Sequence, residues 1–184
     1  MAVKRAGMAL AFAWGAAEAV VFFVVADVLI TLTTARNGFR AGFAAALWAT
    51  AGALLGGMLL YVWAAAAPAA VDQMLDRVPA VSAAQIAVVK RAVSDGWIAA
   101  IWIGGFSGDP YKLYAAAAGE QGVSLLPFLA VSVAARLSRF LASAILAQAV
   151  TSIAQRAGSG RWALPLIAVF WIAFYAWYWS RMPG

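Results

Sequence analysis

Residues 104–120 read GGFSGDPYKLYAAAAGE, and this short stretch decides how the chain can fold. Its centre holds a proline, an aspartate and a lysine, whereas the residues on either side are nearly all apolar. Irregular backbone at membrane depth is tolerated only where protein or trapped water satisfies its polar groups. The sequence therefore predicts that 97–119 is a re-entrant hairpin of two short apolar arms, with its tip at Ser107–Lys112.

The composition indicates an integral membrane protein. The chain has 184 residues, of which 66% are hydrophobic and 11% are charged, whereas a typical soluble domain is about 45–50% apolar. Entering a bilayer takes about 20 predominantly apolar residues. Because so little chain remains outside such stretches, residues 1–184 are predicted to form a single membrane domain. The apolar stretches are 8–34, 41–67, 97–119, 123–150 and 162–180.

Charge and residue usage exclude several classes of function. The net charge is +6, but the 13 basic residues stand singly or in pairs, without the clustered face that nucleic-acid binding needs. They are better interpreted as positive charge next to membrane spans. The chain has no Cys and no His, which excludes disulfides, thiol and imidazole catalysis, haem and typical zinc sites. We therefore expect no cofactor, no metal and no enzymatic activity.

The first apolar stretch, 8–34, contains two acidic residues, Glu18 and Asp27. Nine residues at about 100° each place them on opposite faces of a straight helix. One carboxylate would then face lipid, at a cost of about 2.5–3.5 kcal/mol. If the segment folds back on itself, both carboxylates can face one interior, so a first re-entrant hairpin is predicted. Basic residues flank both ends of this stretch, as expected if both emerge on one side: Lys4, Arg5, Arg36 and Arg40.

Two other stretches are predicted to be ordinary crossing helices. The first, 41–67, is free of charge and is lined by Gly42, Gly52, Gly56 and Gly57, which let neighbouring helices approach closely. The second, 162–180, is predicted to be an anchor helix with an aromatic belt. The belt consists of Trp177, Tyr178 and Trp179.

Residues 71–96 form the most charged part of the chain and are predicted to be a helix on the membrane surface. Within this region, residues 82–96 are predicted to be a capped helix, because Ser82 and Gln85 fit a capping box at its start and Gly96 suits its end. Its apolar face is expected to consist of Ile86, Val89 and Val93, opposite Lys90 and Arg91.

The last long stretch, 123–150, is predicted to be a crossing helix with a polar stripe. The stripe consists of Ser132, Arg136, Arg139 and Ser143, whose spacing puts them on one helix face. A hairpin leaves the chain on the same side of the membrane, and a crossing helix changes the side. The two hairpin-plus-helix units therefore enter from opposite faces. The predicted fold is all-α, with an inverted repeat of two opposed re-entrant hairpins, about three crossing helices and one surface helix. Many secondary transporters place their site between such interrupted helices.

Six charged residues are expected at membrane depth: Glu18, Asp27, Asp109, Lys112, Arg136 and Arg139. They could pair with one another and only fix the geometry of the bundle. Intramembrane ionisable groups, however, concentrate at ion and substrate pathways. Two arginines on one helix face near a broken helix end would suit a phosphate group.

At these residues the chain resembles the DedA family, part of the wider SNARE-associated (VTT) superfamily of membrane proteins. The resemblance covers about residues 9–150 and is carried by three motifs in the family's order and spacing. The first runs from Glu18 to Asp27 and on through Val28, Leu29 and Ile30. The second consists of Phe106, Pro110, Tyr111, Lys112, Ala118 and Gly119. The third consists of Ser132, Arg136, Arg139 and Phe140. The chain lacks the family's prolines at Phe23, Val25 and Ala26, and has Gly108 and Asp109 in place of a Pro-Ile pair.

The resemblance implies a multi-pass protein of the bacterial inner membrane that moves a phosphate-bearing lipid between leaflets, as a flippase or scramblase. Phospholipids and undecaprenyl phosphate are the lipids concerned, some members depend on the proton gradient, and a homo-oligomer is compatible with this class. Arg136, Arg139, Lys112 and Tyr111 are the candidate phosphate contacts. The candidate titratable residues are Glu18, Asp27 and Asp109, and the hairpin tip is assigned to Gly108, Pro110 and Gly119.

Two other interpretations remain open at this point. One is a proton-coupled carrier of a small ion, which belongs to the same broad class. The other is an assembly or scaffold protein of the membrane that has the fold but transports nothing.

Overall fold

The computed structural model describes residues 2–79 and 81–181, and within these ranges the chain is all-helical, without a strand. The elements run α1 (Ala2–Glu18), α2 (Asp27–Asn37), α3 (Phe39–Ala66), α4 (Pro68–Leu75), α5 (Ala83–Ser107), α6 (Tyr111–Glu120), α7 (Leu125–Arg156), the 3₁₀ turn η1 (Gly160–Trp162) and α8 (Ala163–Arg181).

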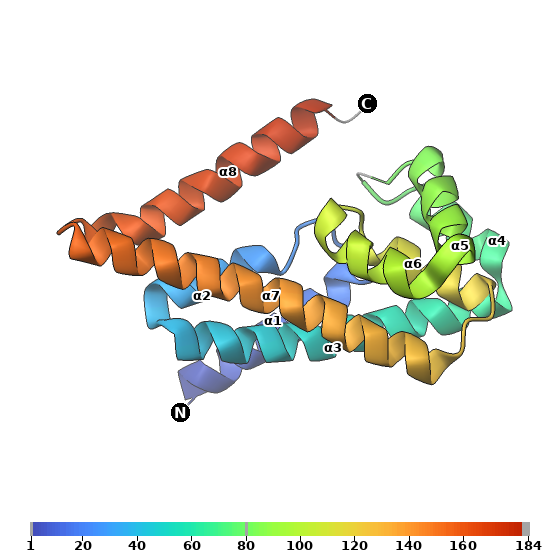
Figure 1. The fold of residues 1–184 in the computed structure, drawn as a ribbon, viewed down its shortest axis with the longest axis horizontal. Coiled ribbons are helices and arrows are strands. Elements are labelled where there is room, and N and C mark those ends of the chain that lie inside the picture. The colour runs from blue at the N-terminus through green and yellow to red at the C-terminus, as the bar shows by residue number, and fades with distance from the viewer. Residues whose placement is uncertain (1, 80, 182–184) are drawn as a thin grey trace.

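Among the described residues, three helices are long and apolar enough to cross a membrane, as expected of a membrane protein. They are α3, α7 and the segment Gly160–Ser180, which consists largely of α8. Helices long enough to cross are thus present where the sequence predicts crossing helices, and α7 extends beyond its predicted end. Figure 1 shows α3 and α7 running along the length of the molecule, with α8 slanting away from α7 at one end.

The first apolar stretch is two helices, as its acidic residues require. Helix α1 ends at Glu18, and α2 begins at Asp27. No proline marks the break between them; instead the Ala17 carbonyl accepts hydrogen bonds from several following amides, which ends the regular helical pattern. The helices extend beyond 8–34, because α1 already begins at Ala2. The side chains of Lys4 and Arg5, expected to flank this stretch, lie outside the described part of the structure.

Helices α1 and α3 pack with their backbones in contact, and glycines make this possible. A Cβ added at Gly52 would collide with the Phe12 carbonyl oxygen of α1, and one at Gly56 would lie 2.5 Å from the Ala16 carbonyl oxygen. Small residues let helices approach this closely, so that dispersion contacts accumulate along the pair. The close packing holds α1 against α3 up to Ala16, two residues before the end of α1.

The predicted surface helix 71–96 is wrong in detail, because the region contains two helices and a turn. Helix α4 ends at Leu75, and α5 starts after Ser82, where the predicted capping box is present. Gly96 does not end the helix but interrupts it with extended backbone (φ 176°, ψ 84°), and α5 continues to Ser107.

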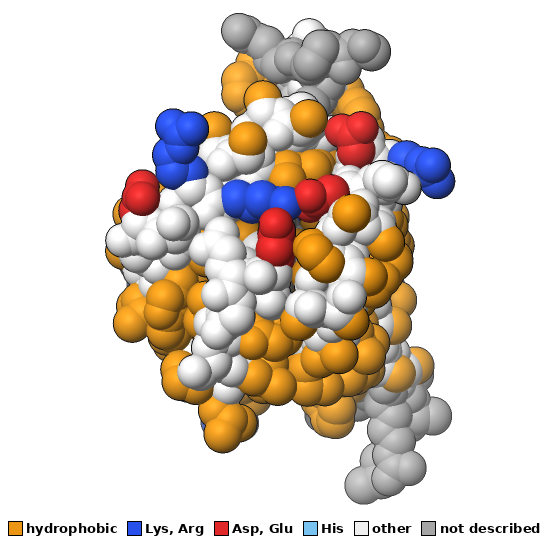
Figure 2. All heavy atoms as spheres, turned by 90° about the vertical axis from the view of Figure 1, so that its right-hand side faces the viewer, with side chains coloured by type: hydrophobic (Ala, Val, Ile, Leu, Met, Phe, Trp, Pro, Cys, Tyr) orange, Lys and Arg blue, Asp and Glu red, His pale blue; other side chains and the backbone are white. Residues whose placement is uncertain are grey.

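Lys90, which was expected opposite the apolar face of its helix, joins three helices. Its ammonium lies 2.6 Å from an Asp72 carboxylate oxygen of α4 and 2.7 Å from a Glu120 oxygen at the end of α6. Burial alone would lower the pKa of Lys90, but these two carboxylates outweigh it and raise the pKa above its ordinary value. Figure 2, which views this end of the molecule, shows acidic and basic side chains side by side and bordered by apolar surface.

The second break lies where the sequence predicts a hairpin tip. Helix α5 ends at Ser107, Gly108 adopts left-handed backbone (φ 95°), and α6 begins at Tyr111. Glycine suits this position because it alone adopts a positive φ without steric cost. Gly119, which was grouped with the tip, lies instead near the end of α6, where an added Cβ would collide with the Tyr61 carbonyl oxygen of α3.

Candidate functional site

The two helix breaks touch each other. The Lys112 ammonium, at the start of α6, donates a hydrogen bond of 3.0 Å to the carbonyl oxygen of Phe22 in the first break. Lys112 is only 2% exposed, so this contact lies inside the protein. The chain thus brings its two irregular segments together. Side chains bond to the backbone of the first break: Lys112 donates to the Phe22 carbonyl, Trp14 donates to the Val24 carbonyl, and Tyr175 accepts from the Val25 amide.

Glu18 and Arg136 form a buried ion pair between the first break and α7. An Arg136 guanidinium nitrogen lies 2.6 Å from one Glu18 carboxylate oxygen, and the side chains are 2% and 8% exposed. The other Glu18 oxygen accepts a hydrogen bond from the Ala26 amide at the start of α2. The guanidinium also lies over the rings of Tyr111 and Phe140, 4.9 and 4.7 Å from their centres, which adds cation–π attraction. Glu18 is thus the last residue of α1, and its carboxylate binds both the backbone at the start of α2 and the Arg136 guanidinium.

A second ion pair joins α2 to the same face of α7. Arg139 donates to an Asp27 carboxylate oxygen at 2.9 Å and, with its other terminal nitrogen, to the Gly105 carbonyl oxygen of α5 at 3.2 Å. The Ser143 hydroxyl donates to the second Asp27 oxygen at 2.5 Å. The predicted polar stripe of α7 therefore faces the first break, where its arginines meet the two acidic residues of the first apolar stretch.

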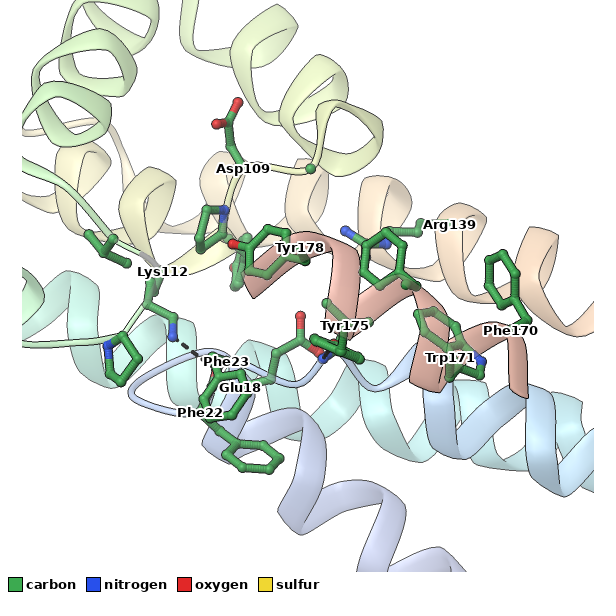
Figure 3. A pocket seen from close by; sticks show the side chains of 17 residues that line it. Glu18, Phe22, Phe23, Asp109, Lys112, Arg139, Phe170, Trp171, Tyr175 and Tyr178 are labelled. Carbon is green, nitrogen blue, oxygen red and sulfur yellow. Dashed lines mark hydrogen bonds between the residues drawn. The ribbon is translucent and has the colours of Figure 1, made fainter. Parts of the chain in front are cut away.

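A cavity of about 160 Å³ lies where the two breaks meet. Its charged lining residues are Glu18, Asp109, Lys112 and Arg139. Its aromatic side chains come from the first break, the start of α6 and α8: Phe22, Phe23, Tyr111, Phe170, Trp171, Phe174, Tyr175 and Tyr178. Figure 3 shows the charged and aromatic side chains around this space. The cavity thus offers both ionic and apolar contacts.

Helix α8 provides one wall of the cavity, a role that the sequence analysis missed. The Trp171 indole donates to the Thr31 hydroxyl of α2 at 2.8 Å, and the Tyr175 hydroxyl accepts from the Val25 amide at 2.9 Å. A signal for this face was present, since residues 171, 174, 175 and 178 follow a helical spacing. In a helix that is apolar all round, however, an aromatic stripe does not stand out.

The predicted site residues differ in their access to this cavity. Arg139, Lys112 and Tyr111 line it, whereas Arg136 is buried behind it. The Asp109 carboxylate accepts hydrogen bonds from the Ser107 hydroxyl at 2.7 Å and the Tyr114 hydroxyl at 3.2 Å. Figure 3 shows this carboxylate pointing away from the interior of the site. The tip residues that line the cavity are Gly108 and Pro110, whereas Gly119 is not among the lining residues.

No group of three His, Cys, Asp or Glu side chains in the described ranges could hold a metal ion. Comparisons with protein-family models, with curated proteins and with solved structures gave no match for this chain.

Proposed function

We propose that this protein translocates a lipid with a phosphate headgroup between the leaflets of a bacterial inner membrane, as its resemblance to the DedA family implies. The observation that carries the proposal is the position of the Asp27–Arg139 pair in an apolar bundle: Asp27 is buried, and its partner Arg139 lines a cavity with aromatic walls. Charged pairs are costly at membrane depth and are typical of substrate and proton pathways there.

On this proposal both broken segments are re-entrant hairpins that enter from opposite faces in an inverted repeat. The contact between Lys112 and Phe22 supports this view, because it joins the two breaks at one point. A site between two interrupted helices can be opened to either side of the membrane in turn by movement of one repeat against the other.

The proposed phosphate contact is Arg139, whose guanidinium can bind a phosphate through two parallel hydrogen bonds. In the structure it is held by Asp27 and by the Gly105 carbonyl. Protonation of Asp27 would remove its negative charge and free the guanidinium for a phosphate on the cavity side. Arrival of the phosphate would in this way be coupled to uptake of a proton. Glu18 and Arg136 hold the bundle next to this exchange.

The apolar part of the lipid is proposed to lie along α8. Only 11% of the most apolar part of this segment is buried inside the protein, and its aromatic side chains line the cavity. A headgroup could therefore enter the cavity while the hydrocarbon chain stays in the bilayer next to α8. This arrangement avoids the free-energy cost of moving the hydrocarbon chain of the lipid out of an apolar environment.

The distribution of charge supports one orientation. Figure 1 shows the α2–α3 and α7–α8 junctions at the same end of the molecule. The exposed charges of these junctions are all basic: Arg36, Arg40, Arg156 and Arg161. The opposite end carries charges of both signs. Because positive charge near helix ends favours the cytoplasm, the all-basic end is proposed to face the cytoplasm.

The proposal is tested with the purified full chain in lipid vesicles. Movement of a chain-labelled phospholipid is measured with and without a pH gradient. We expect movement in vesicles that contain the protein and a faster rate with the gradient. Asp27→Asn keeps the shape of the side chain but cannot titrate, so it should remove the effect of the gradient. A wild-type chain that moves no lipid under either condition would contradict the proposal.

A scaffold function is the second candidate, and one observation favours it. Both oxygens of Glu18 and both oxygens of Asp27 already have protein partners. Such satisfied pairs can serve only to fix the geometry of the bundle. A scaffold should move no lipid in either the wild-type chain or Asp27→Asn, whereas a transporter should lose its pH-dependent lipid movement in Asp27→Asn.

A further inference from the structure

One cation of the site is left over after the ion pairs are formed. Arg136 pairs with Glu18, and Arg139 pairs with Asp27. Lys112 forms no ion pair with any carboxylate of the described residues, and its hydrogen bond goes to the backbone carbonyl of Phe22. The buried part of the site therefore carries one positive charge in excess.

Lys112 also has unused hydrogen-bonding capacity. An ammonium group has three donors, and the structure uses one of them, for the Phe22 carbonyl. Lys112 is only 2% exposed, and it lines the cavity. Figure 3 shows the ammonium on the side of the cavity where Glu18 and Phe22 lie. A buried cation with free donors next to a cavity is suited to an anionic ligand.

Asp109 is the one further carboxylate among the lining residues that could offset this charge. Its oxygen already accepts from the Ser107 and Tyr114 hydroxyls, and the bond to Ser107 lies in an exposed environment. In Figure 3 the carboxylate points away from Lys112. Because Asp109 is the more solvated group, its field at the inner end of the cavity is screened more strongly than that of Lys112.

We infer that Lys112 is a selectivity residue that makes the cavity prefer lipid headgroups of net negative charge, such as a phosphate monoester, over zwitterionic headgroups. This inference rests on the proposed function and specifies its substrate class. The excess charge attracts a phosphate monoester, and the free donors of Lys112 bind its oxygens. A zwitterionic headgroup brings its own cation into the same small cavity, where Lys112 repels it.

The test compares two lipids in vesicles that contain the purified full chain. Phosphatidate and phosphatidylcholine, each labelled on the acyl chain so that the headgroup is unchanged, are present in trace amounts. We expect the wild-type chain to move phosphatidate about tenfold faster, which is the size of effect that one charge-assisted hydrogen bond provides. Lys112→Met should remove most of this preference by slowing phosphatidate, and Lys112→Arg should retain it. Arg91→Met, which removes an exposed surface cation, is the matched control and should leave the preference unchanged.

Equal movement of the two lipids by the wild-type chain would overturn the inference while leaving lipid translocation intact. A full preference for phosphatidate in a folded Lys112→Met chain would also overturn it. If Lys112→Met does not fold, as judged by its thermal unfolding, the relative rates of the two lipids in the wild-type chain and in Lys112→Arg still test the inference. Uptake of radiolabelled inorganic phosphate is measured in parallel. Uptake of inorganic phosphate without movement of either lipid would refute the proposed lipid translocation. If Lys112→Arg then keeps the phosphate uptake, selection of anions by the cation at position 112 would still be supported. If neither lipid nor inorganic phosphate moves, both the proposed translocation and the proposed role of Lys112 are refuted.

Discussion

Glu18 and Arg136 are 118 residues apart in the sequence, yet their side chains form the 2.6 Å ion pair that joins the first helix break to α7. Both side chains are buried, so each charge depends on the other for compensation. Losing one partner of a buried pair costs roughly 3–5 kcal/mol, although the intact pair adds little net stability. The pair therefore fixes the position of the break more than it stabilises the fold.

This relationship predicts strong coupling between the two residues. Glu18→Gln should destabilise the protein by roughly 3–5 kcal/mol, because Arg136 is left as an uncompensated buried charge. Arg136→Gln should have a loss of similar size. The double variant, with two neutral amides, should be at least as stable as either single variant. Thermal unfolding of the four proteins in detergent gives the coupling. Losses that simply add in the double variant would mean that the two charges do not depend on each other.

The second ion pair predicts that Arg139→Lys does not preserve function, although it keeps the charge. The two terminal nitrogens of Arg139 reach Asp27 and the Gly105 carbonyl at the same time. A lysine has one compact ammonium group and cannot reproduce this planar geometry. Loss of a charge-assisted hydrogen bond of about 1.5–3 kcal/mol should slow lipid movement by about tenfold or more.

The control for this prediction is Arg156→Lys, at the exposed end of α7. It should move lipid at the wild-type rate. Unchanged lipid movement in Arg139→Lys would show that Arg139 acts only as a point charge.

Much of the fold could be predicted from the sequence, because the membrane limits the choices. The spacing of Glu18 and Asp27 excludes a straight helix with both carboxylates inside, and the structure has a break between them. The SGDP sequence predicts the second break, which lies at Gly108. In both cases a local pattern conflicts with an uninterrupted apolar helix, so the pattern decides the structure.

Other features could not be predicted because they depend on contacts between distant elements. Lys90 belongs to a pattern that places it opposite the apolar face, but its partners Asp72 and Glu120 come from other helices. The aromatic face of α8 is directed towards the cavity by bonds to Thr31 and Val25. An apolar helix shows no preferred side in its sequence, so this orientation appears only in the structure.

The packing of α1 against α3 predicts different effects on stability for two glycine substitutions. Gly52→Ala places a Cβ against the Phe12 carbonyl oxygen, and overpacking of this kind costs typically about 1–3 kcal/mol. Gly7→Ala is the matched control, since an added Cβ there meets nothing within 4 Å. It should be neutral or stabilise α1 by up to about 1 kcal/mol through helix propensity. Thermal unfolding midpoints in detergent should therefore fall for Gly52→Ala and not for Gly7→Ala. Equal midpoints would mean that the two helices do not pack this closely.

The ion pairs of Lys90 predict a loss of stability in alkaline solution. The pKa of Lys90 in the folded chain lies above its ordinary value of 10.5. The contacts with Asp72 and Glu120 therefore stabilise the fold fully below pH 10.5, and this contribution is lost as the pH rises through the folded pKa. Thermal unfolding between neutral pH and strongly alkaline pH should show a steeper fall for the wild-type chain than for Lys90→Met. Parallel curves would show that these ion pairs contribute nothing measurable.

The membrane topology gives the most direct test of the inverted repeat. The chain has no cysteine, so single cysteines can be placed at will. Ala6 and Asn37 are exposed near the outer ends of α1 and α2, and Asp95 and Ser124 are exposed near the outer ends of the proposed second hairpin. A hairpin leaves the chain on the side from which it entered, whereas a crossing α3 changes the side.

A membrane-impermeant maleimide added to intact cells should therefore distinguish Ala6→Cys and Asn37→Cys from Asp95→Cys and Ser124→Cys. Because the all-basic end is expected in the cytoplasm, the first pair should be protected and the second pair labelled. Two results would contradict two opposed re-entrant hairpins. One is that both pairs are labelled only after the membrane is permeabilised. The other is that Ala6→Cys and Asn37→Cys are labelled from opposite sides, because a segment that crosses the membrane must separate its ends.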